Sequence, residues 1–310
     1  MKKITLFLMG LMCLSASAQQ RQGRQRELPQ KEIGVQLYNY RDLIGGAEKY
    51  AANHVEVLGK LHEMGYTGVE AANYGDGKFY GVSPEQFRKD VEAAGLQVLS
   101  SHASKGLSDE EIANHDFKAA LKWWKQAIKD HKAAGMKYIV TPWANVPKTL
   151  KEAQTICDYH NEIGKLCREA GIRYGYHNHS HEFQKVEDKV WYDYFVEHTD
   201  SQYVFFEMDV YWAVMAQAAP VHYFKEYPGR FTMLHIKDRY ELGESGMVGF
   251  DAIFRAAKTA GLKDYIVEIE GTDGTIDIME ASKRSATFLR TNRSVMPSYT
   301  KDMPQQNWRR

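Results

Sequence analysis

The sequence predicts a single (β/α)8 barrel of the TIM type. Eight short runs of apolar and β-branched residues alternate with longer helix-like segments, and such alternation implies parallel strand pairing. Five of the helix-like segments end in glycine followed by an apolar residue, which is typical of a left-handed helix cap before a strand. Late strand-like runs also end in acidic or imidazole side chains, and α/β barrels place their chemistry at these strand ends.

The elements follow in order along the chain. The predicted strands are residues 33–37, 68–71, 97–101, 138–141, 174–177, 204–208, 232–236 and 265–269. The predicted helices are residues 47–64, 84–94, 114–134, 150–170, 191–197, 219–227 and 251–260. The second helix has a clear start, because Ser83 is a suitable N-cap and Pro84 suits the first helical position. Barrel closure is favoured over an open doubly wound sheet, since no glycine-rich phosphate loop follows the first strand.

The N-terminus has the pattern of an export signal. Lys2 and Lys3 precede an apolar run at residues 4–14, and residues 16–18 (Ala-Ser-Ala) form a small-residue cleavage site. The apolar run is shorter than the ~20 residues that span a membrane. We therefore expect a signal peptide at 1–18, a periplasmic or secreted location and no membrane attachment after cleavage.

The remaining chain is expected to form one catalytic domain. Residues 19–31 and 291–310 are polar and low in complexity, and they predict a flexible leader and a C-terminal tail. Residues 32–290 match the length of one barrel, typically ~250 residues. No internal Pro/Ser-rich linker divides this domain.

Composition narrows the partners. The 310 residues include 40 Lys and Arg and 40 Asp and Glu, and this balance argues against a nucleic-acid partner. After signal cleavage Cys157 and Cys167 remain, and ten helical residues separate them by ~15 Å, too far for a disulfide. We expect a small-molecule substrate, and a homo-oligomer is compatible with the sequence.

Acids and histidines at the strand ends predict a metal site. Because strand side chains alternate between the lumen and the helix layer, ligands must share the inward parity of their strands. Residues of equal parity that close the fifth, seventh and eighth strands are His177 and His179, His235 and Lys237, and Glu268 and Glu270, while Asp209 closes the sixth. Imidazoles with carboxylates suit one divalent ion of Mn, Co, Zn, Ni or Fe, and a set without cysteine argues against structural zinc. The residues leave the choices between His177 and His179, and between Glu268 and Glu270, open.

Other side chains near the strand ends are candidates for contact with the substrate. His102 closes the third strand and is placed to face the same mouth, either as a functional group or as a capped core residue. Tyr38, Trp143 and Trp212 could stack on a sugar ring or could equally plug the top of the barrel.

These motifs resemble the xylose-isomerase-like barrels, a superfamily of sugar isomerases and epimerases that also includes inosose dehydratases and endonuclease IV. The resemblance covers about residues 32–289. It rests on the segments Tyr176-His177-Asn178-His179 with Glu182-Phe183, Asp209 with Trp212, His235-Ile236-Lys237-Asp238, and Val267-Glu268. In this superfamily a Glu, an Asp, a His and a Glu on strands five to eight usually hold one divalent metal. The resemblance therefore implies His177, Asp209, His235 and Glu268 as ligands.

The first of these positions departs from the family, since His177 stands where a Glu is usual. Ketose epimerases of the family use their two Glu ligands as paired acid and base, so simple C3 epimerisation of a free ketose is in doubt. The three-metal site of endonuclease IV needs many more ligands than this chain offers.

The resemblance implies a metal-dependent sugar isomerase or epimerase that abstracts a proton next to a carbonyl of a sugar or keto-sugar. Candidate catalytic residues are Glu268, Glu270, Glu182 and His102; candidate substrate-binding residues are His179, Trp143, Trp212, Lys237, Asp238 and Tyr38. His179 is also a candidate base. The alternatives are a keto-sugar dehydratase or lyase, a non-catalytic periplasmic sugar-binding barrel, and a metal-dependent hydrolase. Export makes a phosphorylated substrate less expected than a free sugar or an oxidised glycoside.

Overall fold

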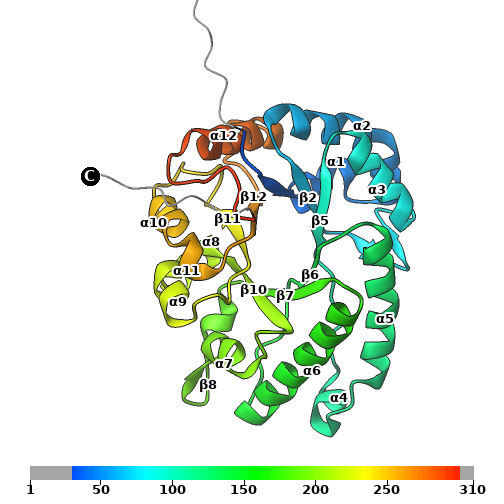
Figure 1. Ribbon diagram of the computed structural model, residues 1–310, viewed down its shortest axis with the longest axis vertical. Coiled ribbons are helices and arrows are strands. Elements are labelled where there is room, and N and C mark those ends of the chain that lie inside the picture. Colours follow the sequence, from blue (N-terminus) through cyan, green and yellow to red (C-terminus); the bar gives the residue numbers. More distant parts are fainter. Residues whose placement is uncertain (1–29, 301–310) are drawn as a thin grey trace, which may run out of the picture.

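Eight parallel strands form a closed barrel in the computed structural model, which describes residues 30–300 (Figure 1). The barrel strands are β1 (Gly34–Gln36), β2 (Gly68–Ala71), β5 (Gln97–Ser101), β6 (Tyr138–Thr141), β7 (Arg173–His177), β10 (Val204–Asp209), β11 (Met233–Lys237) and β12 (Asp264–Glu268). Strand β1 pairs with both β2 and β12, and a parallel bridge between His102 and Val140 joins β5 to β6. The predicted (β/α)8 barrel is confirmed.

Helices surround the strands (Figure 1). Their bounds are α1 (Arg41–Ile44), α2 (Ala47–Met64), α3 (Pro84–Ala93), α4 (Asp109–Asn114), α5 (Lys118–Ala133), α6 (Leu150–Glu169), α7 (Trp191–His198), α8 (Val210–Met215), α9 (Pro220–Glu226), α10 (Phe250–Arg255), α11 (Ala257–Ala260) and α12 (Ile278–Thr291). Two 3-10 turns, η1 (Leu37–Tyr40) and η2 (His181–Phe183), and two short hairpins, β3 (Tyr74–Gly75) with β4 (Lys78–Phe79) and β8 (Lys185–Val186) with β9 (Lys189–Val190), lie in the connections.

The helices differ from the prediction at several places, and the short helices α1 and α8 were not predicted. The segment expected at 114–134 is two helices, because His115 adopts a left-handed conformation with φ 52° that ends α4. The segment expected at 251–260 is also interrupted, at Ala256 between α10 and α11. Helix α12 was not predicted, and the Asp277 carboxylate caps it by accepting from the Glu280 amide.

Residues on both sides of the predicted 32–290 domain pack against it. Lys31 is buried, and its Nζ donates to the carbonyls of Leu289 at 2.8 Å and Asn292 at 2.6 Å. The carbonyl of Pro297 accepts from the Glu32 amide at 2.8 Å. The predicted signal peptide, most of the leader and residues 301–310 lie outside the described residues.

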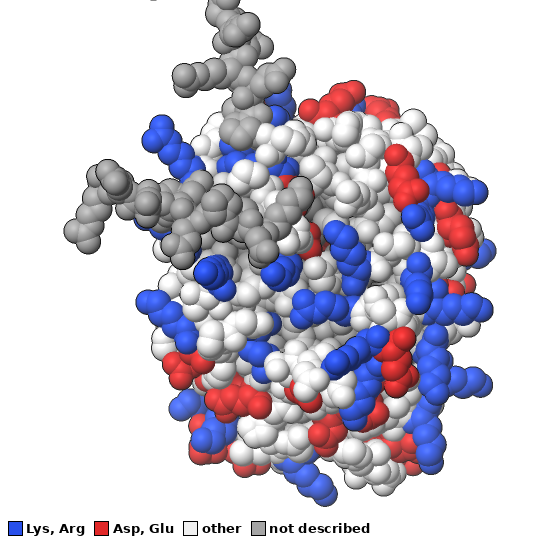
Figure 2. All heavy atoms as spheres, in the orientation of Figure 1, with Lys and Arg blue, Asp and Glu red and all other residues white. Residues whose placement is uncertain are grey.

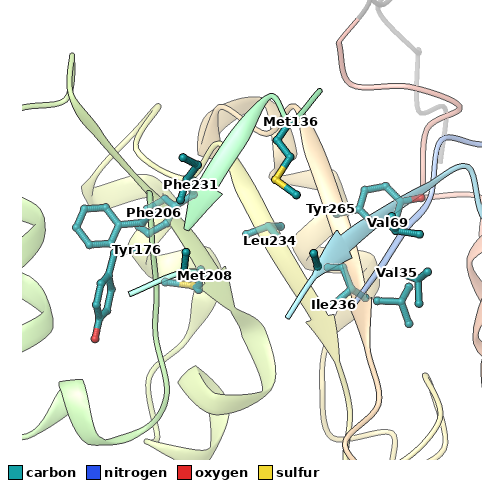
Figure 3. Close-up of a cluster of buried hydrophobic side chains, with 14 of the residues drawn as sticks. Val35, Val69, Met136, Tyr176, Phe206, Met208, Phe231, Leu234, Ile236 and Tyr265 are labelled. Carbon is teal, nitrogen blue, oxygen red and sulfur yellow. The ribbon is translucent and has the colours of Figure 1, made fainter. Parts of the chain in front are cut away.

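Apolar side chains fill both faces of the barrel wall. Outward-facing side chains of the strands pack under the helices (Figure 3), among them Val35, Val69, Tyr176, Phe206, Met208, Leu234 and Ile236. A separate buried cluster fills the lumen: Leu99, Tyr138, Val140, Phe205, Met233 and Ile266. Gly175 makes room for this plug, since a Cβ there would lie 2.4 Å from the Phe205 ring. The plug closes the lower lumen, so polar groups gather at the carboxyl ends of the strands.

The distribution of charged side chains and the state of the two cysteines agree with what the composition predicts. Lysine, arginine and acidic side chains all occur across the face shown in Figure 2. Cys157 and Cys167 are both buried and free, which confirms that they form no disulfide with each other. None of the helices within residues 30–300 is long and apolar enough to cross a membrane.

Candidate active site

The four residues predicted as metal ligands converge at the carboxyl ends of four adjacent strands. His177 ends β7, Asp209 ends β10, His235 lies in β11 and Glu268 ends β12. One ligand atom from each lies within 4.8 Å of the others, and all four side chains are buried. Strand parity therefore predicted the faces of these residues correctly.

Unpartnered polar atoms test whether these residues fit a metal. Among the described residues, Oδ2 of Asp209 is buried without a hydrogen-bond partner. A buried polar group left unpaired costs about 1–3 kcal/mol, and native proteins leave few of them. Burial also raises the pKa of Asp209 to about 7, although the nearby Lys237 lowers it in part. A mixed imidazole and carboxylate set with such an acceptor fits one divalent cation.

Asp209 divides its two oxygens between structure and site. Its Oδ1 accepts from the backbone amide of Trp212 at 2.8 Å and so forms the N-cap of α8, a helix that the prediction lacks. An aspartate is well suited to this position, because its side chain satisfies an amide that the helix leaves unpaired. The second oxygen is left free for a ligand.

Two buried carboxylates beneath the predicted ligands were not predicted. Oε1 of Glu70 lies 2.8 Å from Nε2 of His235 and accepts from Nε2 of Gln36 at 2.7 Å. Oε2 of Glu207 lies 3.3 Å from Nε2 of His235 and 3.4 Å from Nδ1 of His177. Glu207 shares the parity of Asp209, a pattern that could have identified it. No comparable signal in the sequence indicated Glu70, which is a single acidic residue within the apolar strand at residues 68–71.

His102 belongs to this lower layer, so its prediction as a catalytic residue is not supported. Its Nε2 lies 3.0 Å from Oε1 of Glu70 and 3.1 Å from Oε2 of Glu207. Burial lowers the pKa of His102, but the charges and hydrogen bonds of Glu70 and Glu207 outweigh burial and raise it to about 9. Both carboxylates face the same nitrogen of His102, so this nitrogen is engaged with the protein and is poorly placed to accept a proton from a substrate.

Lys237 links the site to its rim. Its buried Nζ lies 3.2 Å from Oε2 of Glu268 and 2.6 Å from Oε1 of Glu270, and 4.8 Å from the centre of the Trp212 ring. Burial lowers the pKa of Lys237, but Glu268, Asp209 and Glu270 together raise it above its usual value. The Glu268 side chain is 8% exposed and that of Glu270 is 41% exposed. Glu268 thus belongs to the ligand cluster, and Glu270 lies at the mouth.

Glu182 holds the loop after β7 and is not free to act as a base. Its Oε1 accepts from the Tyr176 hydroxyl at 2.7 Å and its Oε2 from the His179 amide at 2.9 Å. Burial raises the pKa of Glu182. Both oxygens are committed to the protein, so the prediction of a catalytic Glu182 is not supported by its placement.

His179 faces the mouth between two aromatic rings. Its ring centre lies 5.1 Å from that of Trp143 and 5.7 Å from that of Trp212. Its Nδ1 has no partner among the described residues, and burial lowers the pKa of His179 to about 4. This imidazole is therefore available to a bound molecule.

The remaining predicted residues divide between the rim and a loop. Trp143 is 53% exposed and Tyr38 is 45% exposed, with the Arg41 guanidinium 4.6 Å from the Tyr38 ring centre. Asp238 is buried, and it accepts from the amides of Arg239 at 2.8 Å and Gly243 at 3.1 Å. Its carboxylate shapes the loop after β11, which argues against the predicted contact with substrate.

Comparisons with known proteins agree with this architecture. The profile of the xylose isomerase-like TIM barrel family matches residues 58–292. A sugar phosphate isomerase/epimerase from Parabacteroides distasonis is 33% identical with a TM-score of 0.78, and the match covers 87% of this chain and 97% of that one. No curated protein matches the sequence significantly.

More distant structures share the fold. The 3-keto-D-glucoside 4-epimerase YcjR from E. coli is 20% identical with a TM-score of 0.60, covering 84% of this chain and all of that one (100%). The IolI protein, solved with a zinc atom, is 14% identical with a TM-score of 0.61, covering 84% of this chain and 97% of that one. The extent of the profile match and the identity to the P. distasonis structure show that the chain belongs to the xylose isomerase-like TIM barrel family.

Proposed function

We propose that the protein is a divalent-metal-dependent isomerase or epimerase that acts on a sugar or keto-sugar. The observation that carries this proposal is the convergence of His177, Asp209, His235 and Glu268, which bring buried ligand atoms within 4.8 Å of one another. The relatives support it, since two are described as a sugar phosphate isomerase/epimerase and a 3-keto-D-glucoside 4-epimerase, and IolI was solved with zinc.

The four residues would hold one divalent ion, and such an ion supplies Lewis-acid polarisation of a carbonyl and its neighbouring hydroxyl. Lys237 adds a fixed positive charge beside the site, 3.2 Å from Glu268. Preorganised charges of this kind stabilise negative charge that develops on a substrate during proton abstraction. Because Lys237 is buried, little solvent screens this charge.

We assign the proton transfer to His179. The other candidates are engaged: Glu268 is one of the four proposed ligands, Glu182 is bonded to Tyr176, and His102 lies between two carboxylates. Glu270 is paired with Lys237 at 2.6 Å. His179 alone among these candidates keeps a buried ring nitrogen without a partner beside the mouth, and general base catalysis typically contributes ~10²–10⁴-fold. Trp143 and Trp212 flank this imidazole and offer faces on which a sugar ring would pack.

An elimination is the second candidate reaction, and His177 favours it. The paired acid and base of the family's ketose epimerases need a Glu at this position, and this chain has a histidine there. Loss of a β-oxygen after proton abstraction needs one base beside the carbonyl, and the protonated base can then return the proton to the departing oxygen. A dehydratase or lyase would therefore use the same His179 and the same ligands.

We further propose that the substrate carries no phosphate and that the protein acts outside the cytoplasm. The export pattern at residues 1–18 supports this location, and it lies outside the described residues. The P. distasonis relative is described as acting on sugar phosphates, so phosphorylated and free sugars should be compared directly.

Solvent deuterium incorporation tests the proposal. The metal-loaded protein is incubated in D2O with free and phosphorylated ketoses and with 3-keto-glucosides, and NMR follows the carbons next to the carbonyl. We expect exchange in the wild type, loss of exchange in His179→Gln, and full exchange in His222→Gln, which changes an exposed histidine on α9. Rearranged sugars would identify an isomerase or epimerase, and an unsaturated product would identify a lyase. Exchange that persists in His179→Gln would disprove the assigned base, and sugar binding without any exchange would favour a binding protein.

A further inference from the structure

We propose that Glu70 and Glu207 are positioning residues, which hold His235 and His177 so that one chosen nitrogen of each imidazole is directed at the metal. The inference rests on the proposed metal site and adds to it two residues that no motif in the sequence predicted. Together with His102, these carboxylates form what we call the lower layer, directly beneath the candidate ligands.

His235 shows the arrangement most clearly. Its Nε2 lies 2.8 Å from Oε1 of Glu70, whereas its Nδ1 lies 3.4 Å from Oε2 of Glu268. A carboxylate on one imidazole nitrogen keeps the proton there and leaves the lone pair of the other nitrogen for a metal. Glu70 therefore selects the tautomer in which Nδ1 of His235 is the ligand atom.

Glu70 is itself held firmly, as a positioning group must be. Its side chain is fully buried, and Oε1 also accepts from Nε2 of Gln36 at 2.7 Å. The Ser100 hydroxyl donates to its second oxygen, Oε2. Three strands, β1, β2 and β5, thus fix one carboxylate against the underside of His235.

Glu207 lies below both imidazoles. Its Oε2 is 3.3 Å from Nε2 of His235 and 3.4 Å from Nδ1 of His177, so this oxygen faces one nitrogen of each ring. With Nδ1 of His177 turned toward Glu207, Nε2 is the nitrogen that remains for the metal. Glu207 and Asp209 are two residues apart on β10 and share its inward parity, so one strand supplies both a ligand and the group beneath it.

His102 bridges the two carboxylates of the lower layer. Buried carboxylates need donors to their oxygens, because a buried charge left without a partner is costly. Nε2 of His102 lies 3.0 Å from Glu70 and 3.1 Å from Glu207, and its Nδ1 lies 3.4 Å from Nε2 of Gln36. The imidazole thereby joins the two carboxylates into one unit.

Metal binding to Glu70→Gln and Glu207→Gln tests the inference. The matched control is Asp264→Asn, which removes a buried carboxylate bonded to the Tyr138 hydroxyl at 2.7 Å in the same lumen but away from the histidines. Metal-free proteins are titrated with Mn²⁺ or Zn²⁺ by calorimetry, and bound metal is counted by elemental analysis. We expect one equivalent in the wild type, a Kd about 10–100-fold weaker in both Gln variants, and a Kd within about twofold of wild type in the control.

The outcomes separate this inference from the proposed function. One tightly bound ion in the wild type with unchanged Kd in both Gln variants would overturn the positioning role alone. Two ions in the wild type, one of them lost in Glu207→Gln, would also overturn it, since the lower layer would then be a metal site of its own. A wild type that takes up no ion would overturn both proposals.

A crystal structure of the loaded wild type decides the inference even where a Gln variant fails to fold. We expect Nδ1 of His235 and Nε2 of His177 on the ion. Coordination through Nε2 of His235 would refute the arrangement.

Discussion

Asp209→Asn should make the protein more stable than the wild type without metal and less stable than the wild type with metal bound. In the wild type, Oδ1 of Asp209 caps α8 through the Trp212 amide, and Oδ2 is buried without a partner. Asparagine is as good an N-cap as aspartate, so the first interaction survives the change. The second position changes from an unpaired carboxyl oxygen to an amide that can donate to the neighbouring Glu268, whose ligand atom lies within 4.8 Å.

The size of each effect follows from these contacts. A buried unsatisfied group costs about 1–3 kcal/mol, so without metal Asp209→Asn should unfold with a free energy about 1–3 kcal/mol higher than the wild type. At a metal concentration of about 100 times Kd, the ion should stabilise the wild type by about 2.7 kcal/mol. The variant has lost a ligand charge and should gain much less, so the wild type becomes the more stable protein.

Urea unfolding with EDTA and with Mn²⁺ or Zn²⁺ measures both effects. Asp264→Asn again serves as control, because its carboxylate is bonded to Tyr138 and its loss should lower stability equally in both solutions. The reasoning would be refuted if Asp209→Asn were less stable than the wild type in EDTA, or if metal stabilised both proteins by the same amount.

Three further predictions concern the core, the mouth and a buried histidine. Gly175→Ala places a Cβ 2.4 Å from the Phe205 ring and should lower the unfolding free energy by ~1–3 kcal/mol. The control Gly59→Ala in α2 has open space around its Cβ and should raise the unfolding free energy by ~1 kcal/mol. Equal shifts in urea unfolding of the two variants would contradict the close packing of Gly175 against Phe205. Trp143→Ala removes a 53% exposed ring and should raise KM for a sugar by ~2–10-fold with little change in stability; an unchanged KM would exclude stacking there. Burial lowers the pKa of His131 to about 4, below its value of about 6.5 in the unfolded chain. Because the unfolded state therefore binds a proton at higher pH, the stability of the folded protein should fall as the pH drops from about 6.5 toward 4. The slope is at most ~1.4 kcal/mol per pH unit. Urea unfolding at pH 7 and pH 5 should show that His131→Gln loses less stability on acidification than the wild type, and identical losses would contradict the shift.

Local patterns predicted most of the barrel, because strand burial and helix punctuation depend on neighbouring residues. Helix α12 was missed, because the polar segment before it contains no helix-start signal other than the Asp277 cap. The break at His115 was also missed, because no sequence pattern within a helical segment reliably predicts a histidine with a left-handed backbone conformation.

Within the site, the alternation of side chains along each strand predicted which residues point into the lumen, but it did not predict their hydrogen-bond partners. It correctly grouped Asp209 with His235 and Glu268. It could not show that Glu182 is bonded to Tyr176 or that Asp238 binds loop amides, because those bonds depend on how the loops turn after their strands.

The sequence by itself determined the order of the elements, the limits of the strands to within one residue and the inward face of each strand, and these bring the candidate ligands to one end of one lumen. Only the tertiary structure decided which side chains meet across that lumen. Glu70 and His235 are 165 residues apart, and they meet because the barrel closes with a particular stagger between strands that are not neighbours. Periodicity shows whether a residue points into the lumen or toward the helices. Closure and stagger of the barrel decide its level along the barrel axis and the side chains that it contacts across the lumen, so the lower layer can be recognised only in the folded barrel.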